Sequence, residues 1–388
     1  MKKKYIIFLI ITLVLLVVLI TSFNYFKTTN TYIDDSVNNQ TKITKGISMN
    51  LEQTAGAGDY KTVTRSSWPT EGYKFNTELS RCENGGEINW DDINKKVIVT
   101  GNVSDKCYVY FDIWIPSIAA YCTSGTDLAT CVKNFGDQGP SVSNIYIHNS
   151  ALTNGAGDNS YRYAGANPNN YVCFGSEATT CPDANLFRII GVFGDQAKVI
   201  RAKSVGDQPW HTSQVNNWSS SSLNTYLNGE YLTSLGTLAE KIATTTWKVG
   251  GGDEANISFS VPATAYQYEV GSSASTTTVD KKIGLMYVSD YYYGASPSAW
   301  TLVGYDSDAT KDYRAATSTN WLYLGSTEWT ISRNSGYTYL AFLVNSAGYV
   351  YYSGYVPVSL AVRPSFNLLS SVKYISGSGS MSDPVRIN

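Results

Sequence analysis

The feature that most restricts this chain is an apolar run that follows three lysines at its N-terminus. Residues 5–20 carry no charge, and with residues 21–26 they reach the roughly 20 positions that a helix needs to cross a bilayer. The lysines favour a cytoplasmic N-terminus and an exported remainder. A cleaved signal peptide is the alternative, but the run is long for one and no Ala-x-Ala-like site follows it.

We therefore expect residues 1–27 to hold the cytoplasmic lysines and a transmembrane signal anchor. Residues 28–45 are polar and rich in Thr and Asn, which is typical of a flexible tether. This pattern predicts a single-pass protein of the cell membrane whose C-terminal part is extracellular. The membrane is thus the first predicted partner.

Six cysteines follow the predicted anchor, in an exterior where disulfides persist. Pairing between sequence neighbours is the simplest arrangement, although the sequence alone leaves other connectivities open. A zinc site is the weaker alternative, because there is no Cys-x-x-Cys repeat and the two histidines stand apart. The expected structural disulfides are Cys82 with Cys107, Cys122 with Cys131, and Cys173 with Cys181.

The composition predicts a globular exterior part that carries little charge. Hydrophobic residues make up 43% of the chain and charged residues only 15%, against a usual share of about a quarter. The net charge of −2 gives no basic stripe of the kind that nucleic-acid binding needs. Thirty tyrosines against two histidines favour flat amphipathic contacts over groups that titrate near neutral pH.

The exported part divides into two predicted units. Residues 87–90 and 95–100 flank a polar turn and predict a β-hairpin. The alternation in residues 107–113 places Cys107, Val109, Phe111 and Ile113 on one face of a strand. The expected division is a small β domain at 46–116, a connector at 117–140 and a second domain at 141–388.

The second domain shows both strand and helix patterns. Residues 185–193 and 197–202 predict two strands joined by a tight turn. Serines at 219–222 are N-cap candidates for a helix that Asn228-Gly229 is expected to end. Residues 282–288 are apolar and predict another strand.

No pattern in the chain identifies a catalytic site. His148 and His211 have no recognisable nucleophile or orienting acid beside them, so both are expected to be surface or structural residues. Asp306, Asp308 and Asp312 offer oxygens for calcium, but they lack the glycine and terminal glutamate of an EF-hand loop. A solvated acidic turn is the favoured interpretation, and no enzyme activity, metal or cofactor is predicted.

The C-terminal block from Trp329 to Leu368 is typical of short strands joined by glycine turns. Arg363 lies between Val362 and Pro364 in an apolar context, so it is expected to be partly buried and paired. Trp329 and Arg363 are therefore predicted to be structural. Tyrosines in the glycine-bounded hairpins suit adaptable recognition, and the binding-surface candidates are Tyr337, Tyr339, Tyr349, Tyr351, Tyr352 and Tyr355.

Several stretches in order resemble an uncharacterised domain of unknown function found in exported proteins of Gram-positive bacteria. The resemblance covers most of residues 171–368, and the tail at 376–384 is also similar. It depends on the stretches at residues 186–192, 222–228, 284–290, 328–332 and 362–364.

A more distant similarity is to C-type-lectin-like folds, including the formylglycine-generating-enzyme branch. That similarity implies a mixed α+β domain of many short strands with few helices. The enzyme branch depends on cysteines late in its domain, and this chain has none after Cys181. The calcium-binding loop motif of the lectin branch is also missing, so only the fold is expected to carry over.

The expected fold class is thus α+β: an N-terminal transmembrane helix, a small all-β unit and a C-type-lectin-like domain. The favoured function is a membrane-anchored bacterial surface protein that binds or adheres through tyrosine-rich loops, with a glycan or a protein as ligand. A structural cell-envelope component is the first alternative. A cell-envelope enzyme on a lectin-like scaffold is the second.

Overall fold

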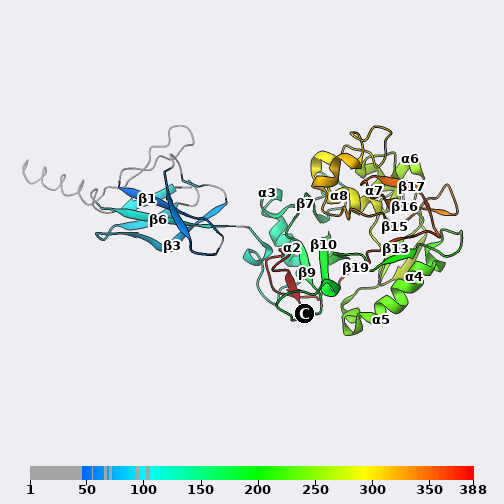
Figure 1. Cartoon of the computed structure of the whole chain (residues 1–388), viewed down its shortest axis with the longest axis horizontal. Helices are drawn as coiled ribbons and strands as arrows, with labels where there is room; N and C mark the ends of the chain where they lie inside the picture. The colour runs from blue at the N-terminus through cyan, green and yellow to red at the C-terminus, as the bar shows by residue number, and fades with distance from the viewer. Residues whose placement is uncertain are drawn as a thin grey trace, which may run out of the picture. The chain divides into compact units, whose positions relative to one another are not determined.

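The computed structural model describes residues 46–388 except for positions 55, 65–67, 70–71, 92–93, 95, 101–104 and 115. The predicted membrane anchor and tether lie outside these described residues. The chain divides into two compact units, Met1–Ile115 and Pro116–Asn388. Figure 1 shows the strands and helices of each unit.

The first unit is built from β-strands alone in its described part. A four-stranded sheet has the order β2-β1-β6-β3, with β1 parallel to β6, and a separate hairpin joins β4 to β5. The strands are β1 (Ile47–Glu52), β2 (Tyr60–Val63), β3 (Tyr73–Cys82), β4 (Glu87–Asp91), β5 (Lys96–Thr100) and β6 (Cys107–Ile113).

Alternation in β6 builds the core of this unit. Cys107, Val109 and Phe111 are buried, while Ile113 is only half-buried. Phe75 and Trp90 pack against Phe111 with ring centroids 5.8 and 5.5 Å apart. The predicted hairpin and the predicted strand are both confirmed.

Two larger sheets organise the second unit. The eight-stranded sheet has the order β19-β11-β10-β9-β21-β20, with β8 paired to β10 and β7 paired to β8. Its strands are β7 (Ile145–Ile147), β8 (Tyr161–Tyr163), β9 (Tyr171–Cys173), β10 (Leu186–Phe193), β11 (Gln196–Arg201), β19 (Ser365–Asn367), β20 (Tyr374–Ser376) and β21 (Val385–Ile387). The predicted hairpin between β10 and β11 is confirmed.

The second sheet has five strands in the order β12-β18-β15-β16-β17. A two-stranded ribbon of β13 and β14 stands apart from it. These strands are β12 (Asp207–Pro209), β13 (Thr245–Lys248), β14 (Thr278–Lys281), β15 (Glu328–Arg333), β16 (Leu340–Val344), β17 (Val350–Tyr355) and β18 (Ser359–Ala361). Figure 1 shows β9, β10 and β19 in one part of this unit and β15–β17 in another.

Short helical segments connect the strands. The α-helices are α2 (Leu128–Gly136), α3 (Pro140–Ser143), α4 (Ser222–Tyr226), α5 (Leu232–Ser234), α6 (Glu254–Ile257), α7 (Pro262–Glu269) and α8 (Val288–Gly294). The 3₁₀ turns are η1 (Ile118–Ala120), η2 (Asp183–Asn185), η3 (Trp218–Ser220), η5 (Gly236–Lys241), η6 (Pro297–Ala299) and η7 (Tyr313–Thr319), and η4 (Leu227–Tyr231) is a π turn.

The predicted α+β fold class is wrong, because the structure is mostly β-sheet and only 21% helical. The longest α-helix in the described part has nine residues, so the helices are short connections between strands. None of the described helices has the length and apolarity needed to cross a bilayer. The physical reason is local composition: β-branched and aromatic residues dominate the apolar runs, and Gly, Ser and Asn interrupt each helix early.

The segment at 117–140, predicted to be a connector, belongs to the second unit. Leu128, Val132 and Phe135 of α2 enter the main core, and Ile118 joins them. Cys131 of the same helix is fully buried and bonded to Cys122. This segment is therefore an integral layer of the second unit, since a connector would not bury a whole helix face.

Two further sequence predictions need correction. The helix that begins at Ser222 does not end at Asn228-Gly229 but continues through the π turn η4 into α5. Residues 282–287 form no strand, and Gly284 makes only an isolated bridge to Ser365. The two segments are linked: the Asn228 side chain donates to the carbonyl of Ile283 and accepts from its N–H, at 2.8 and 3.0 Å, so these backbone groups of Ile283 are not free for a neighbouring strand.

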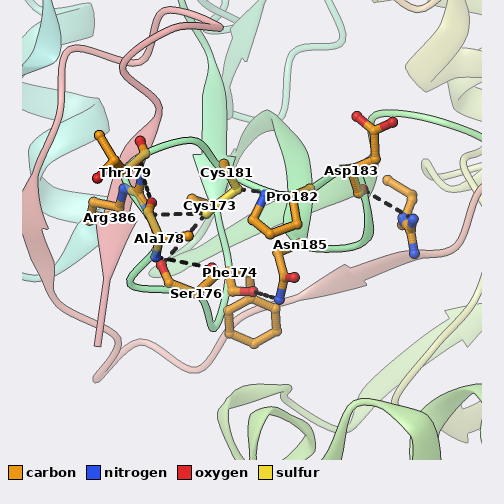
Figure 2. Close-up of a disulfide and its surroundings, with 11 residues drawn as sticks. Cys173, Phe174, Ser176, Ala178, Thr179, Cys181, Pro182, Asp183, Asn185 and Arg386 are labelled. Atoms are coloured by element: carbon orange, nitrogen blue, oxygen red, sulfur yellow. Dashed lines mark hydrogen bonds between the residues drawn. A yellow bond between two sulfur atoms is a disulfide. The ribbon is translucent and has the colours of Figure 1, made fainter.

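All six cysteines form disulfides, and each pairs with its neighbour in the sequence. Figure 2 shows the loop closed by Cys173 and Cys181. The guanidinium of Arg386 in β21 donates to the carbonyls of Ser176 and Ala178, at 2.7 and 2.8 Å. The bridge and the arginine together fix a loop that has no regular structure of its own.

Candidate functional sites

The two residues predicted to be structural are Trp329, which belongs to β15, and Arg363, which bonds a residue of β15. Arg363 is 3% exposed and donates two hydrogen bonds to the carboxylate of Glu328, at 2.7 and 2.8 Å. It also donates to the carbonyl of Leu322 at 2.6 Å. Trp329 is buried, and its indole N–H donates to the carbonyl of Gln208 at 3.0 Å. Burial raises the pKa of Glu328, and Arg363 opposes part of that rise.

A second buried charge network lies around α8. The Lys198 ammonium donates to Asp290 at 2.5 Å, and Arg162 lies 3.6 Å from the same carboxylate. Arg162 also pairs with Asp158 at 2.7 Å. The N–H of Tyr287 donates to Asp290, so this carboxylate also caps the start of the helix. Two cations and two carboxylates thus neutralise one another inside the fold.

Several tyrosines are buried in the core of the second unit. Tyr291, Tyr292 and Tyr313 are fully buried, and each hydroxyl donates to a backbone carbonyl, at 2.7, 2.8 and 2.9 Å. Burial raises the pKa of all three well above its ordinary value. The tyrosine-rich composition therefore serves the core as well as the surface.

Three of the predicted binding tyrosines come together on the surface. Tyr337 and Tyr339 are each 42% exposed and Tyr355 is 39% exposed. Ring centroids are 6.1 Å apart for Tyr337 and Tyr339, and 6.3 Å apart for Tyr339 and Tyr355. In the part of the chain that the structure describes, none of these three hydroxyls has a protein partner.

Two exposed valines adjoin these rings along the backbone. Val215 and Val358 are each 47% exposed. The N–H of Val358 donates to the carbonyl of Tyr355 at 3.0 Å. Asn216, the residue after Val215, donates its side-chain amide to the carbonyl of Tyr337 at 2.6 Å. We call Val215, Tyr337, Tyr339, Tyr355 and Val358 the tyrosine patch.

The other three candidates, Tyr349, Tyr351 and Tyr352, belong to a different group. They form a closed series of ring contacts with Phe259 and Tyr305, with centroids 5.2 to 6.0 Å apart. We call these five side chains the aromatic cluster. Phe259 is exposed, whereas the three predicted tyrosines are half-buried.

A charged pair lies against the aromatic cluster. The guanidinium of Arg314 lies 5.7 Å from the ring centre of Tyr305 and 5.3 Å from that of Tyr349. Asp312 accepts from two nitrogens of Arg314, at 2.9 and 2.7 Å. In the acidic turn, the buried carboxylate of Asp312 is therefore neutralised by Arg314.

Part of the backbone of β17 is bonded outside the sheet, although β17 is its last strand. The N–H of Val350 donates to the carbonyl of Gly304, and its carbonyl accepts from the hydroxyl of Ser258, both at 2.9 Å. The carbonyl of Tyr352 accepts from the side chain of Asn334 at 3.0 Å. These backbone groups of Val350 and Tyr352 are therefore not free for strand addition.

The two histidines lie in different surroundings. His148 is fully buried, accepts from the N–H of Ala156 at 3.0 Å and packs against Tyr293 and Trp300. Burial lowers its pKa to about 2. His211 lies in the loop after β12 and accepts from the N–H of Ser213. The structure does not bring the two histidines into one site.

The sequence did not identify Val215 and Val358 of the patch, or Phe259 and Tyr305 of the aromatic cluster. Val358 lies in the turn just after Tyr355, whereas Val215, Phe259 and Tyr305 are distant in the sequence and only folding brings them to the tyrosines. No local pattern marks an isolated valine or phenylalanine as exposed. No family model, curated protein or solved structure matches this chain.

Proposed function

We propose that this chain is a bacterial cell-surface protein that docks a partner protein outside the cell through its tyrosine patch. The observation that carries this proposal is the series of three exposed tyrosine rings in contact, with two exposed valines next to them along the backbone. Tyrosine supplies wide amphipathic contact at a small cost in conformational entropy. Three free hydroxyls add hydrogen-bonding groups to an otherwise apolar surface.

The chemistry of the patch favours a protein over a glycan. None of its five residues is charged, and protein interfaces are enriched in aromatic residues and depleted of charge at their centre. The patch has no carboxylate or amide side chain to bond sugar hydroxyls, so its side-chain hydrogen bonds to a glycan would come from the three tyrosine hydroxyls alone. The three disulfides support an oxidising exterior as the site of action.

The test is a pair of arrays, one of extracellular and cell-surface proteins and one of glycans, probed with the full chain in detergent. We expect reproducible binding on the protein array. Binding only on the glycan array would overturn the partner class. Silence on both arrays, or self-association as the sole signal, would overturn the proposed function and favour a structural envelope component.

A further inference from the structure

The second unit also contains a pocket, and none of the residues that line it belongs to the tyrosine patch. A pocket of about 250 Å³ opens beside the charge network at α8, lined by Lys198, Asn367, Trp247, Tyr287, Tyr266 and Val270 among others. This volume is below the roughly 300 Å³ at which pockets for drug-sized ligands begin. The space therefore suits one small chemical group, such as a single sugar or a capped amino acid.

The floor of the pocket is built from two opposed side chains. Lys198 of β11 and Asn367 of β19 are register partners in the sheet, so their side chains share one face. Lys198 donates one of its three N–H groups to Asp290 and has no other hydrogen bond among the described residues. The Asn367 amide donates to Thr245 at 3.0 Å, and its oxygen is buried without a partner.

This arrangement leaves a donor and an acceptor on one face of the sheet. The amide nitrogen of Asn367 is the end that bonds Thr245, so its unpaired end is the oxygen, an acceptor. An unpaired buried polar atom destabilises the fold, so a ligand that bonds it gains affinity. The group that this floor fits offers an N–H and a carbonyl together.

The ion pairs buried in the walls favour a neutral ligand. The cations Lys198 and Arg162 are paired with Asp290 and Asp158. Lys248 is also in the lining and keeps its charge; it is half-buried and donates to the carbonyl of Gly271 at 3.2 Å. The rings of Trp247, Tyr287 and Tyr266 supply apolar walls. A charged ligand would compete with ion pairs already formed inside the fold, whereas an uncharged group would not.

We infer that this pocket binds a small neutral ligand through a secondary amide, with the amide placed between Lys198 and Asn367. The ligand carbonyl accepts from the Lys198 ammonium, and its N–H donates to the oxygen of Asn367. An acetamido group has this chemistry, and its methyl fits against Val270. Such a group occurs on N-acetylated sugars and on acylated amino acids.

The test is saturation-transfer NMR on the full chain with three probes. N-acetylglucosamine and N-acetylglycine amide carry the acetamido group, and glucose lacks it. We expect saturation of the acetyl methyl for at least one of the first two probes, and which of them responds identifies the source of the ligand. No acetyl saturation, as for a pocket filled only by water, or an equal response from glucose, would overturn the inference.

Two variants make the test specific to this pocket. Asn367→Ala removes the unpaired amide, and Val270→Trp fills the space without changing the polar floor. We expect each to weaken binding of the responding probe at least tenfold, while Asn134→Ala on the exposed side of α2 leaves it unchanged. Unchanged affinity in Val270→Trp, with the melting temperature of the parent chain, would contradict binding at this site. The tyrosine patch plays no part in this readout, so the two proposals fail independently.

Discussion

Arg363 shows how a single buried charge shapes this fold. Its apolar sequence neighbours made burial predictable, but its partner could not be named. Glu328 lies 35 positions earlier, and nothing in its local sequence distinguishes it from an exposed glutamate. Pairing is a property of the folded chain, because β15 and the segment after β18 meet only once the five-stranded sheet has formed.

Glu328→Gln is expected to lower the free energy of unfolding by about 3–5 kcal/mol, since it leaves Arg363 buried without a counter-charge. Urea unfolding followed by tryptophan fluorescence measures this loss. The control replaces both partners, Glu328→Met with Arg363→Met, and should lose less than the single variant. A single variant within about 1 kcal/mol of the parent chain would refute the assigned role of the pair.

His148 predicts a pH dependence of stability. Its pKa is about 2 in the folded chain, whereas an exposed histidine of the unfolded chain keeps the ordinary value of 6.5. Below pH 6.5 the unfolded chain binds a proton that the folded chain does not, so stability falls as the pH falls. We expect a loss of about 2 kcal/mol between pH 7 and pH 5 from this residue. Chemical unfolding at both pH values should show a smaller loss in His148→Phe; equal losses would contradict this assignment.

At the scale of elements, strands were easier to predict than helices. The β4–β5 and β10–β11 hairpins follow from alternation and polar turns, which are local properties. The continuation of α4 through Asn228-Gly229 is not local, because the Asn228 side chain bonds Ile283, 55 residues away. The alternation of tyrosines in β17 also misleads, since a register shift in the pairing of β16 with β17 changes which rings are exposed.

Asn228→Ala is expected to cost about 1–3 kcal/mol, because both backbone groups of Ile283 lose their partner. Urea unfolding is the measurement, and Asn134→Ala on the exposed side of α2 is the matched control. The control should stay within about 0.5 kcal/mol of the parent chain. Equal effects of the two substitutions would show that Asn228 does not link the helix to this segment.

On the scale of the whole molecule, the three disulfides make the stability of the fold depend on the redox conditions around it. Replacing Cys173 and Cys181 together with alanine is expected to cost about 2–4 kcal/mol under oxidising conditions. In reducing buffer the two chains should have the same stability, because every bridge is then open in both. Identical stability of the two chains in oxidising buffer would show that this bridge contributes nothing to the fold.

The predicted topology has its own measurement. Protease added outside intact cells is expected to remove the disulfide-bonded units, while an internal marker protein stays intact. The lysines and the apolar run predict this orientation from the sequence alone. Full protection of both units without lysis would place them inside the cell and remove the basis for an external partner.

An affinity comparison shows whether the tyrosine patch contacts the partner. The partner found on the array is titrated against the parent chain, the combined Tyr337→Ala, Tyr339→Ala and Tyr355→Ala variant, and Tyr268→Ala. Tyr268 is the matched control, because it is 38% exposed and lies in α7, outside the patch. We predict at least a hundredfold weaker binding for the combined variant and no change for the control. Equal affinity of all three chains would contradict the account.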